Sequence, residues 1–86
     1  MGRYYFHLKR VDQRILWDEE GSELPDLEAA RAEALQAARA LVADAILMGC
    51  DVETQAILVM DEQGQELNHI PLRMVMPKSL LSRRLN

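Results

Sequence analysis

Hydrophobic and polar residues alternate near the start of the chain. In residues 3–9, Tyr4, Phe6 and Leu8 fall on one side of an extended chain and mostly polar side chains fall on the other. A period of two is typical of a strand with one buried face. Residues 14–17 form a second, shorter β-prone run, which we expect to return antiparallel as a hairpin partner.

A long stretch of helix-forming residues follows. Residues 26–48 are rich in Ala, Leu, Glu and Arg, and they contain no Gly or Pro. Asp26 can accept hydrogen bonds from the first free N–H groups of a helix, and Gly49 is the residue type favoured just past a helix end. These signals predict one helix over residues 26–48.

The apolar arc of this helix is wider than one sheet face needs. On a helical wheel, a core stripe is formed by Leu27, Ala30, Ala34, Ala38, Leu41, Ala45 and Met48. Three further residues, Leu35, Val42 and Ile46, extend the arc sideways. We therefore predict that Leu35, Val42 and Ile46 form a protein interface, either in a homodimer or with another protein.

The second half of the chain predicts two more strands. Residues 54–60 are the most apolar run and are typical of a central strand buried on both faces. Residues 65–72 continue as a further strand, and Pro71 marks an edge or the strand end. The whole pattern predicts an α+β fold of order β-β-α-β-β, with one long helix packed on a mostly antiparallel four-stranded sheet. We expect the strand order 2-1-3-4.

An acidic motif occurs twice, as DEEGSEL in residues 18–24 and as DEQGQEL in residues 61–67. An Asp followed three positions later by Gly favours a type I turn, because the carboxylate accepts local N–H groups and Gly tolerates positive φ. A calcium-binding loop needs a different spacing of oxygen ligands. We interpret both copies as turns, one leading to a helix and one to a strand.

Charge is distributed unevenly along the chain. Residues 1–66 contain six basic and all 14 acidic residues, a net charge of −8, whereas the last 20 residues carry +4. We predict a single domain over residues 1–76 and a basic tail over residues 77–86, frayed or docked as a short helix. Its Lys78, Arg83 and Arg84 are candidate contacts for nucleic acid, which is the less favoured partner.

Motifs for catalysis, nucleotide binding or metal binding do not occur in the sequence. His7 and His69 lack an obvious third ligand, so each is expected to be a surface histidine or one satisfied by hydrogen bonds. We expect no enzyme activity, no cofactor and no metal. The lone Cys50 fits a reducing compartment, and the chain has neither a membrane-spanning run nor an export signal, so we expect a cytoplasmic protein.

The order of RYYFH at residues 3–7, D-x-EG at residues 18–21, LPDLEAA at residues 24–30 and DE-x-G at residues 61–64 resembles a family of small bacterial domains of unknown function. The likeness spans about residues 3–72 and implies only a fold.

Residues 4–40 are also similar, more distantly, to antitoxins of the HicB type. That likeness implies a non-catalytic, often oligomeric domain that binds a toxin and regulates its own operon, although no separate DNA-binding domain follows here. Our hypothesis is a self-associating protein-interaction module. The alternative is an antitoxin-like or nucleic-acid-associated regulator that uses the basic tail.

Overall fold

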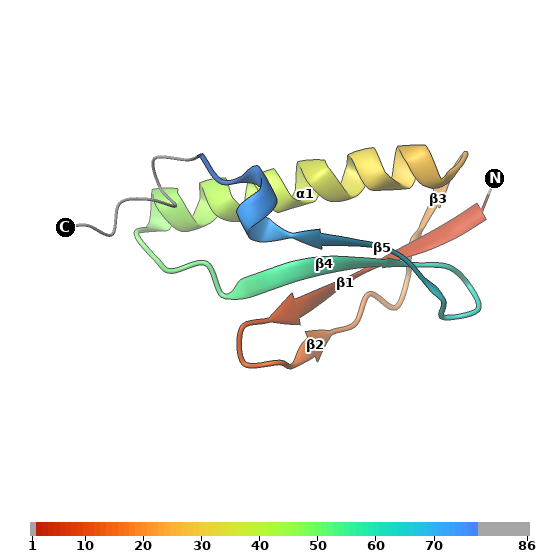
Figure 1. Cartoon of the computed structure of the whole chain (residues 1–86), viewed down its shortest axis with the longest axis horizontal. Helices are drawn as coiled ribbons and strands as arrows, with labels where there is room; N and C mark the ends of the chain where they lie inside the picture. Colours follow the sequence, from red (N-terminus) through yellow and green to blue (C-terminus); the bar gives the residue numbers. More distant parts are fainter. Residues whose placement is uncertain (1, 78–86) are drawn as a thin grey trace.

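The computed structural model describes residues 2–77, which form two layers. The helix α1 (Leu27–Met48) lies along one face of an antiparallel sheet, as Figure 1 shows. A short 3-10 helix, η1 (Leu72–Val75), follows the last strand. The strands are β1 (Gly2–Arg10), β2 (Ile15–Leu16), β3 (Ser22–Leu24), β4 (Thr54–Met60) and β5 (Glu66–Pro71). The predicted α+β class and two-layer architecture are confirmed.

The strand order is β2-β1-β4-β5, and all the pairings are antiparallel. This is the predicted order 2-1-3-4, because β4 and β5 are the third and fourth predicted strands. The very short strand β3 was not predicted. It pairs with the start of β1, where Tyr4 lies opposite Ser22, while β2 pairs with the end of β1, where Leu8 lies opposite Leu16. Residues 17–21 loop out between these two pairings.

The core lies between α1 and the sheet. On β1, Tyr4, Phe6 and Leu8 pack against the core as predicted, but the most buried residue of the strand is His7 on the opposite face. On β4 the buried side chains face both ways, as predicted for a central strand, and residues 56–59 are all buried. The largest fully buried side chains are Ile57, Val59, Ile70 and Leu72.

The helix begins and ends where the sequence predicted. The Asp26 carboxylate accepts a hydrogen bond from the Ala29 backbone N–H at 2.8 Å, which caps the first turn. Gly49 follows the last helical residue with φ of 68°, a left-handed conformation that Gly adopts without a side-chain clash. Within the described part of the chain, no helix is long and apolar enough to cross a membrane.

One row of residues on α1 faces the sheet. Ala30, Ala34 and Ala38 are completely buried, and Val42 is 5% exposed. Small alanine side chains let the helix backbone lie close to the sheet. The predicted stripe was wrong at its two ends, since Leu27 and Met48 are 39% and 75% exposed.

Candidate functional site

The first acidic motif is a turn, as predicted, and its Asp18 carboxylate also reaches β1. Oδ1 accepts hydrogen bonds from the N–H groups of Glu20 and Gly21 at 3.3 and 3.1 Å. Oδ2 accepts from the N–H of Phe6 at 3.2 Å. Phe6 lies in the part of β1 between its pairings with β2 and β3, so Asp18 satisfies a strand donor that neither short strand reaches.

Hydrogen bonds and a nearby histidine determine the ionisation of Asp18. Partial burial alone would raise its pKa, but the backbone N–H groups of Gly21, Phe6 and Glu20, together with His7, hold the pKa below its ordinary value. The carboxylate is therefore charged at neutral pH and serves as an acceptor in the turn.

His7 is buried beside this turn, with 7% of its surface exposed. Its Nδ1 accepts a hydrogen bond from the Asp18 backbone N–H at 3.0 Å. The ring packs edge-on against Trp17, with centroids 4.7 Å apart, and stacks on Tyr5 at 6.2 Å. Burial lowers its pKa, and the Asp18 carboxylate opposes that change in part. His7 is thus a histidine satisfied by its hydrogen bond, one of the two predicted alternatives.

The two histidines lie on the same sheet face but do not meet. Leu58 of β4 pairs with His7 on one side and with His69 on the other, so a whole strand separates them, roughly 10 Å between backbones. Among residues 2–77, no three His, Cys, Asp or Glu side chains gather in a way that could hold a metal ion.

The second acidic motif is also a turn and joins β4 to β5. The Asp61 carboxylate accepts hydrogen bonds from the N–H groups of Gln63 and Gln65 at 2.9 and 2.8 Å. Gly64 adopts φ of 79°. The prediction that this turn leads to a strand is confirmed. The prediction that the first turn leads to a helix was wrong, because it leads into β3 and α1 begins only at Leu27.

The predicted interface residues of α1 occupy three different environments. Leu35 is half-buried and packs against the core, whereas Ile46 is 59% exposed. The prediction of an interface at Val42 was wrong, because Val42 lies in the domain's own core and is not available to a partner. The two residues after Ile46 are also exposed, Leu47 to 83% and Met48 to 75%. We call Ile46, Leu47 and Met48 the α1-end surface.

A hollow of about 530 Å³ lies where β1 ends, β4 begins and β5 passes into η1. It is within the size range of small-molecule sites. Its polar lining consists of Lys9, Thr54, Gln55, His69 and Arg73, and its apolar lining of Val11, Val52, Ala56, Pro71, Leu72 and Met76. The sequence did not indicate this site, since Lys9 and Arg73 lie far apart in the chain and no motif connects them.

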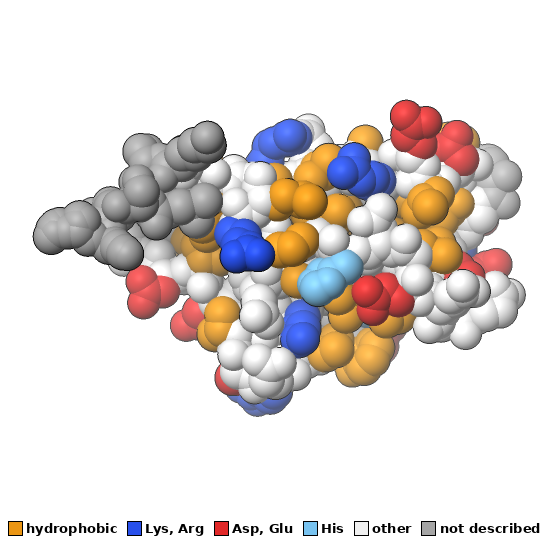
Figure 2. Space-filling view, viewed as in Figure 1, with side chains coloured by type: hydrophobic (Ala, Val, Ile, Leu, Met, Phe, Trp, Pro, Cys, Tyr) orange, Lys and Arg blue, Asp and Glu red, His pale blue; other side chains and the backbone are white. Residues whose placement is uncertain are grey.

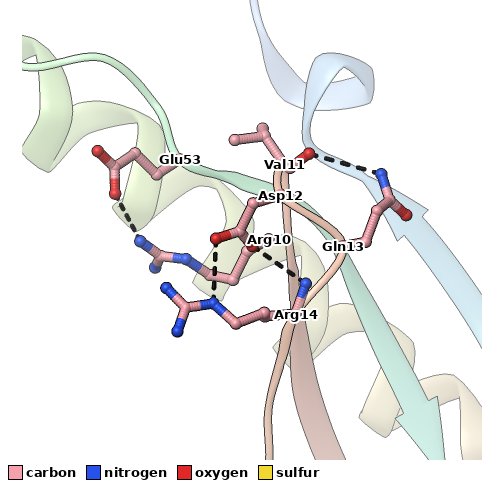
Figure 3. A network of polar contacts seen from close by, with 6 residues as sticks. All are labelled: Arg10, Val11, Asp12, Gln13, Arg14 and Glu53. Carbon is pink, nitrogen blue, oxygen red and sulfur yellow. Dashed lines mark hydrogen bonds and ion pairs between the residues drawn. The ribbon is translucent and has the colours of Figure 1, made fainter.

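Val11 of the β1–β2 turn lines this hollow, and the turn is tied to the segment before β4 (Figure 3). Arg10 makes an ion pair with Glu53 at 2.6 Å, and the Val11 N–H donates to the Glu53 carbonyl at 2.9 Å. Arg14 pairs with Asp12 at 3.0 Å, and its N–H and guanidinium hydrogen bonds lower the Asp12 pKa. Arg10 is therefore paired with a carboxylate of the segment before β4, and Arg14 with one inside the turn.

The predicted nucleic-acid contacts Lys78, Arg83 and Arg84 lie outside the described residues. Their role, like that of the whole predicted tail, stays a prediction.

The fold and its surfaces define a small two-layer α+β domain. Residues 3–73 match the family model described as Domain of unknown function (DUF6894), and the chain belongs to this family. No curated protein and no solved structure matches the chain. This match confirms the predicted membership of a family of unknown function. The likeness to HicB-type antitoxins stays a prediction.

Proposed function

We propose that this domain is a non-catalytic protein-interaction module that self-associates through the α1-end surface. The observation that carries the proposal is the spacing of the buried row on α1. Ile46 follows Val42 at the same interval of four residues that separates Ala34, Ala38 and Val42, yet Ile46 is 59% exposed and Val42 only 5%. Ile46 thus continues the core row but is largely exposed, and with Leu47 and Met48 it leaves apolar surface around the end of α1 for a partner.

A second copy of the chain is the partner that charge favours. The first 66 residues carry −8, and the last 20 carry +4. Two copies can place the basic end of one against the acidic body of the other, which is an arrangement that one type of chain supplies by itself. Burial of three large apolar side chains would add the nonpolar part of the contact.

Addition of a strand at β5 is a less suitable mode of association. The outward N–H of His69 is already occupied by the Asn68 side chain at 2.9 Å. Backbone N–H groups along a strand alternate in direction, so the next outward position is 71, and Pro71 has no N–H. This edge is therefore a poor template for another strand.

Light scattering over a wide concentration range tests the proposal, using the full-length protein, Leu47→Lys and the control Ala43→Lys. Leu47 and Ala43 are both exposed on α1. We expect a dimer that Leu47→Lys weakens by at least about tenfold, while Ala43→Lys leaves it unchanged. Added salt should weaken the dimer in part. A strict monomer at every concentration would contradict self-association.

The alternative is an antitoxin-like or nucleic-acid-associated regulator that uses Lys78, Arg83 and Arg84. The charge asymmetry of the sequence and the distant similarity of residues 4–40 to HicB-type antitoxins favour it. Fluorescence anisotropy of labelled duplex DNA, with the full-length protein and a version ending at Met76, tests this function. Binding that weakens with salt and disappears on truncation would support the regulator. A cytoplasmic location is part of both proposals.

A further inference from the structure

The hollow at the end of the sheet is basic, although the domain around it is acidic. Lys9 and Arg73 line it, and none of its lining residues is acidic. Among residues 2–77, neither cation has a carboxylate within 4.0 Å, whereas Arg3, Arg10 and Arg14 are all paired. Lys9 and Arg73 therefore keep their charge available at the rim of the hollow.

A local irregularity of the sheet shapes this site. Lys9 pairs with Ala56 and Arg10 pairs with Thr54, so Gln55 is the extra residue of a β-bulge on β4. Bulges redirect side chains and are frequent next to binding sites. Here the bulge places the Gln55 amide on the hollow beside Thr54, and both side chains can donate a hydrogen bond.

The rest of the lining is apolar. Figure 2 shows basic side chains, a histidine and, beside the histidine, an acidic side chain around hydrophobic patches over β5 and η1. Pro71 and Leu72 belong to this apolar lining, and His69 belongs to the polar one. A ligand that suits both parts would carry one oxyanion on a short hydrocarbon group, because an inorganic anion would leave the apolar wall unused.

We propose that this hollow binds a small organic anion, such as a short-chain carboxylate or an alkyl phosphate. Lys9 and Arg73 attract the oxyanion, Gln55 and His69 orient it, and the apolar lining takes the hydrocarbon part. The site is open and its cations are partly solvated, so we expect millimolar affinity. This inference does not depend on self-association, because the α1-end surface shares no residue with the hollow.

NMR titration of the full-length, isotope-labelled protein tests the inference, with hexanoate, hexyl phosphate, inorganic phosphate and hexylamine as probes. We expect saturable shifts at Thr54, Gln55 and Arg73 with the two organic anions and none with hexylamine. Lys9→Gln and Arg73→Gln should each weaken binding by about fivefold. Arg39→Gln, which removes an exposed helix cation that does not line the hollow, should have no effect.

The outcomes separate the two parts of the proposal. Inorganic phosphate that binds as tightly as hexanoate would overturn the role of the apolar lining. Equal binding of hexylamine, or unchanged hexanoate affinity in both cation variants, would overturn anion recognition. Preference between hexanoate and hexyl phosphate identifies the ligand class. The spectra of unliganded variants report whether the fold is retained.

Discussion

The two acidic turns have the same local chemistry but contribute differently to the fold. In both, an Asp carboxylate accepts backbone N–H groups and a Gly three positions later adopts positive φ. Asp18 also bonds to β1, and Gly21 is packed so closely that an added Cβ would lie 2.8 Å from the Tyr5 ring. At Gly64 an added Cβ would meet nothing within 4 Å.

This difference shows that a turn motif does not reveal its own tertiary importance. The second turn only reverses the chain between neighbouring strands. The first also holds together a sheet in which two short strands share one long partner, because Asp18 fills the gap between them. Variants at equivalent positions should therefore differ in stability.

The largest effect should come from the two glycines. Gly21→Ala forces a non-Gly residue into φ of 71° and brings its Cβ within 3.0 Å of the Tyr4 carbonyl oxygen, so we expect a loss of about 3 kcal/mol in the free energy of unfolding. Gly64→Ala introduces only backbone strain, so we expect it to lower the free energy of unfolding by about 1 kcal/mol. Urea unfolding of both variants measures the difference. Equal losses would mean that packing around Gly21 can relax.

The next effect should come from the two aspartates. Asp18→Ala leaves three backbone N–H groups without their acceptor, one of them on β1, and should cost about 2 kcal/mol. Asp61→Ala frees exposed N–H groups that water can reach, and should cost about 0.5 kcal/mol. The same unfolding experiment measures both. If Asp61→Ala proves as destabilising as Asp18→Ala, the contact with Phe6 contributes nothing.

The smallest effect is a pH dependence specific to the first turn. The pKa of His7 in the folded protein lies below its ordinary value of 6.5. Its contribution to the free energy of unfolding is therefore complete above pH 6.5, and it declines as the pH falls toward the pKa of the folded protein. Asp18 has a folded pKa below 3.8, so its contribution is lost only as the pH falls through that lower value. Unfolding free energies measured from pH 8 to about pH 3 should decline in both windows.

Two variants show which residue causes the loss of stability in each pH range. His7→Asn keeps an acceptor for the Asp18 N–H and should remove the decline that begins near 6.5. Asp18→Asn should reduce the decline at lower pH, and what is left there includes the contribution of Asp12, whose pKa is also lowered. If the unfolding free energy of His7→Asn still declines below pH 6.5, another titratable group causes that decline.

Much of the fold follows from local signals in the sequence. Asp26 and Gly49 mark the helix ends, the apolar run of residues 54–60 marks the central strand, and the two D-x-x-G motifs mark turns. The environments of Val42 and Ile46 could not be predicted, because the two residues are one helical turn apart and only the tertiary packing against α1 decides which of them is covered. The hollow was missed because a bulge and a distant 3-10 helix bring its residues together.

The overhang of α1 has a consequence for motion. Beyond Val42 the helix loses its buried row, so its last turns depend mainly on their own backbone hydrogen bonds and on the cap at Gly49. Segments with few buried contacts open locally at low free-energy cost. Amide hydrogen exchange should therefore quicken from Ala38 toward Met48. A partner that covers Ile46 would slow it again, so the helix end would become ordered as the assembly forms.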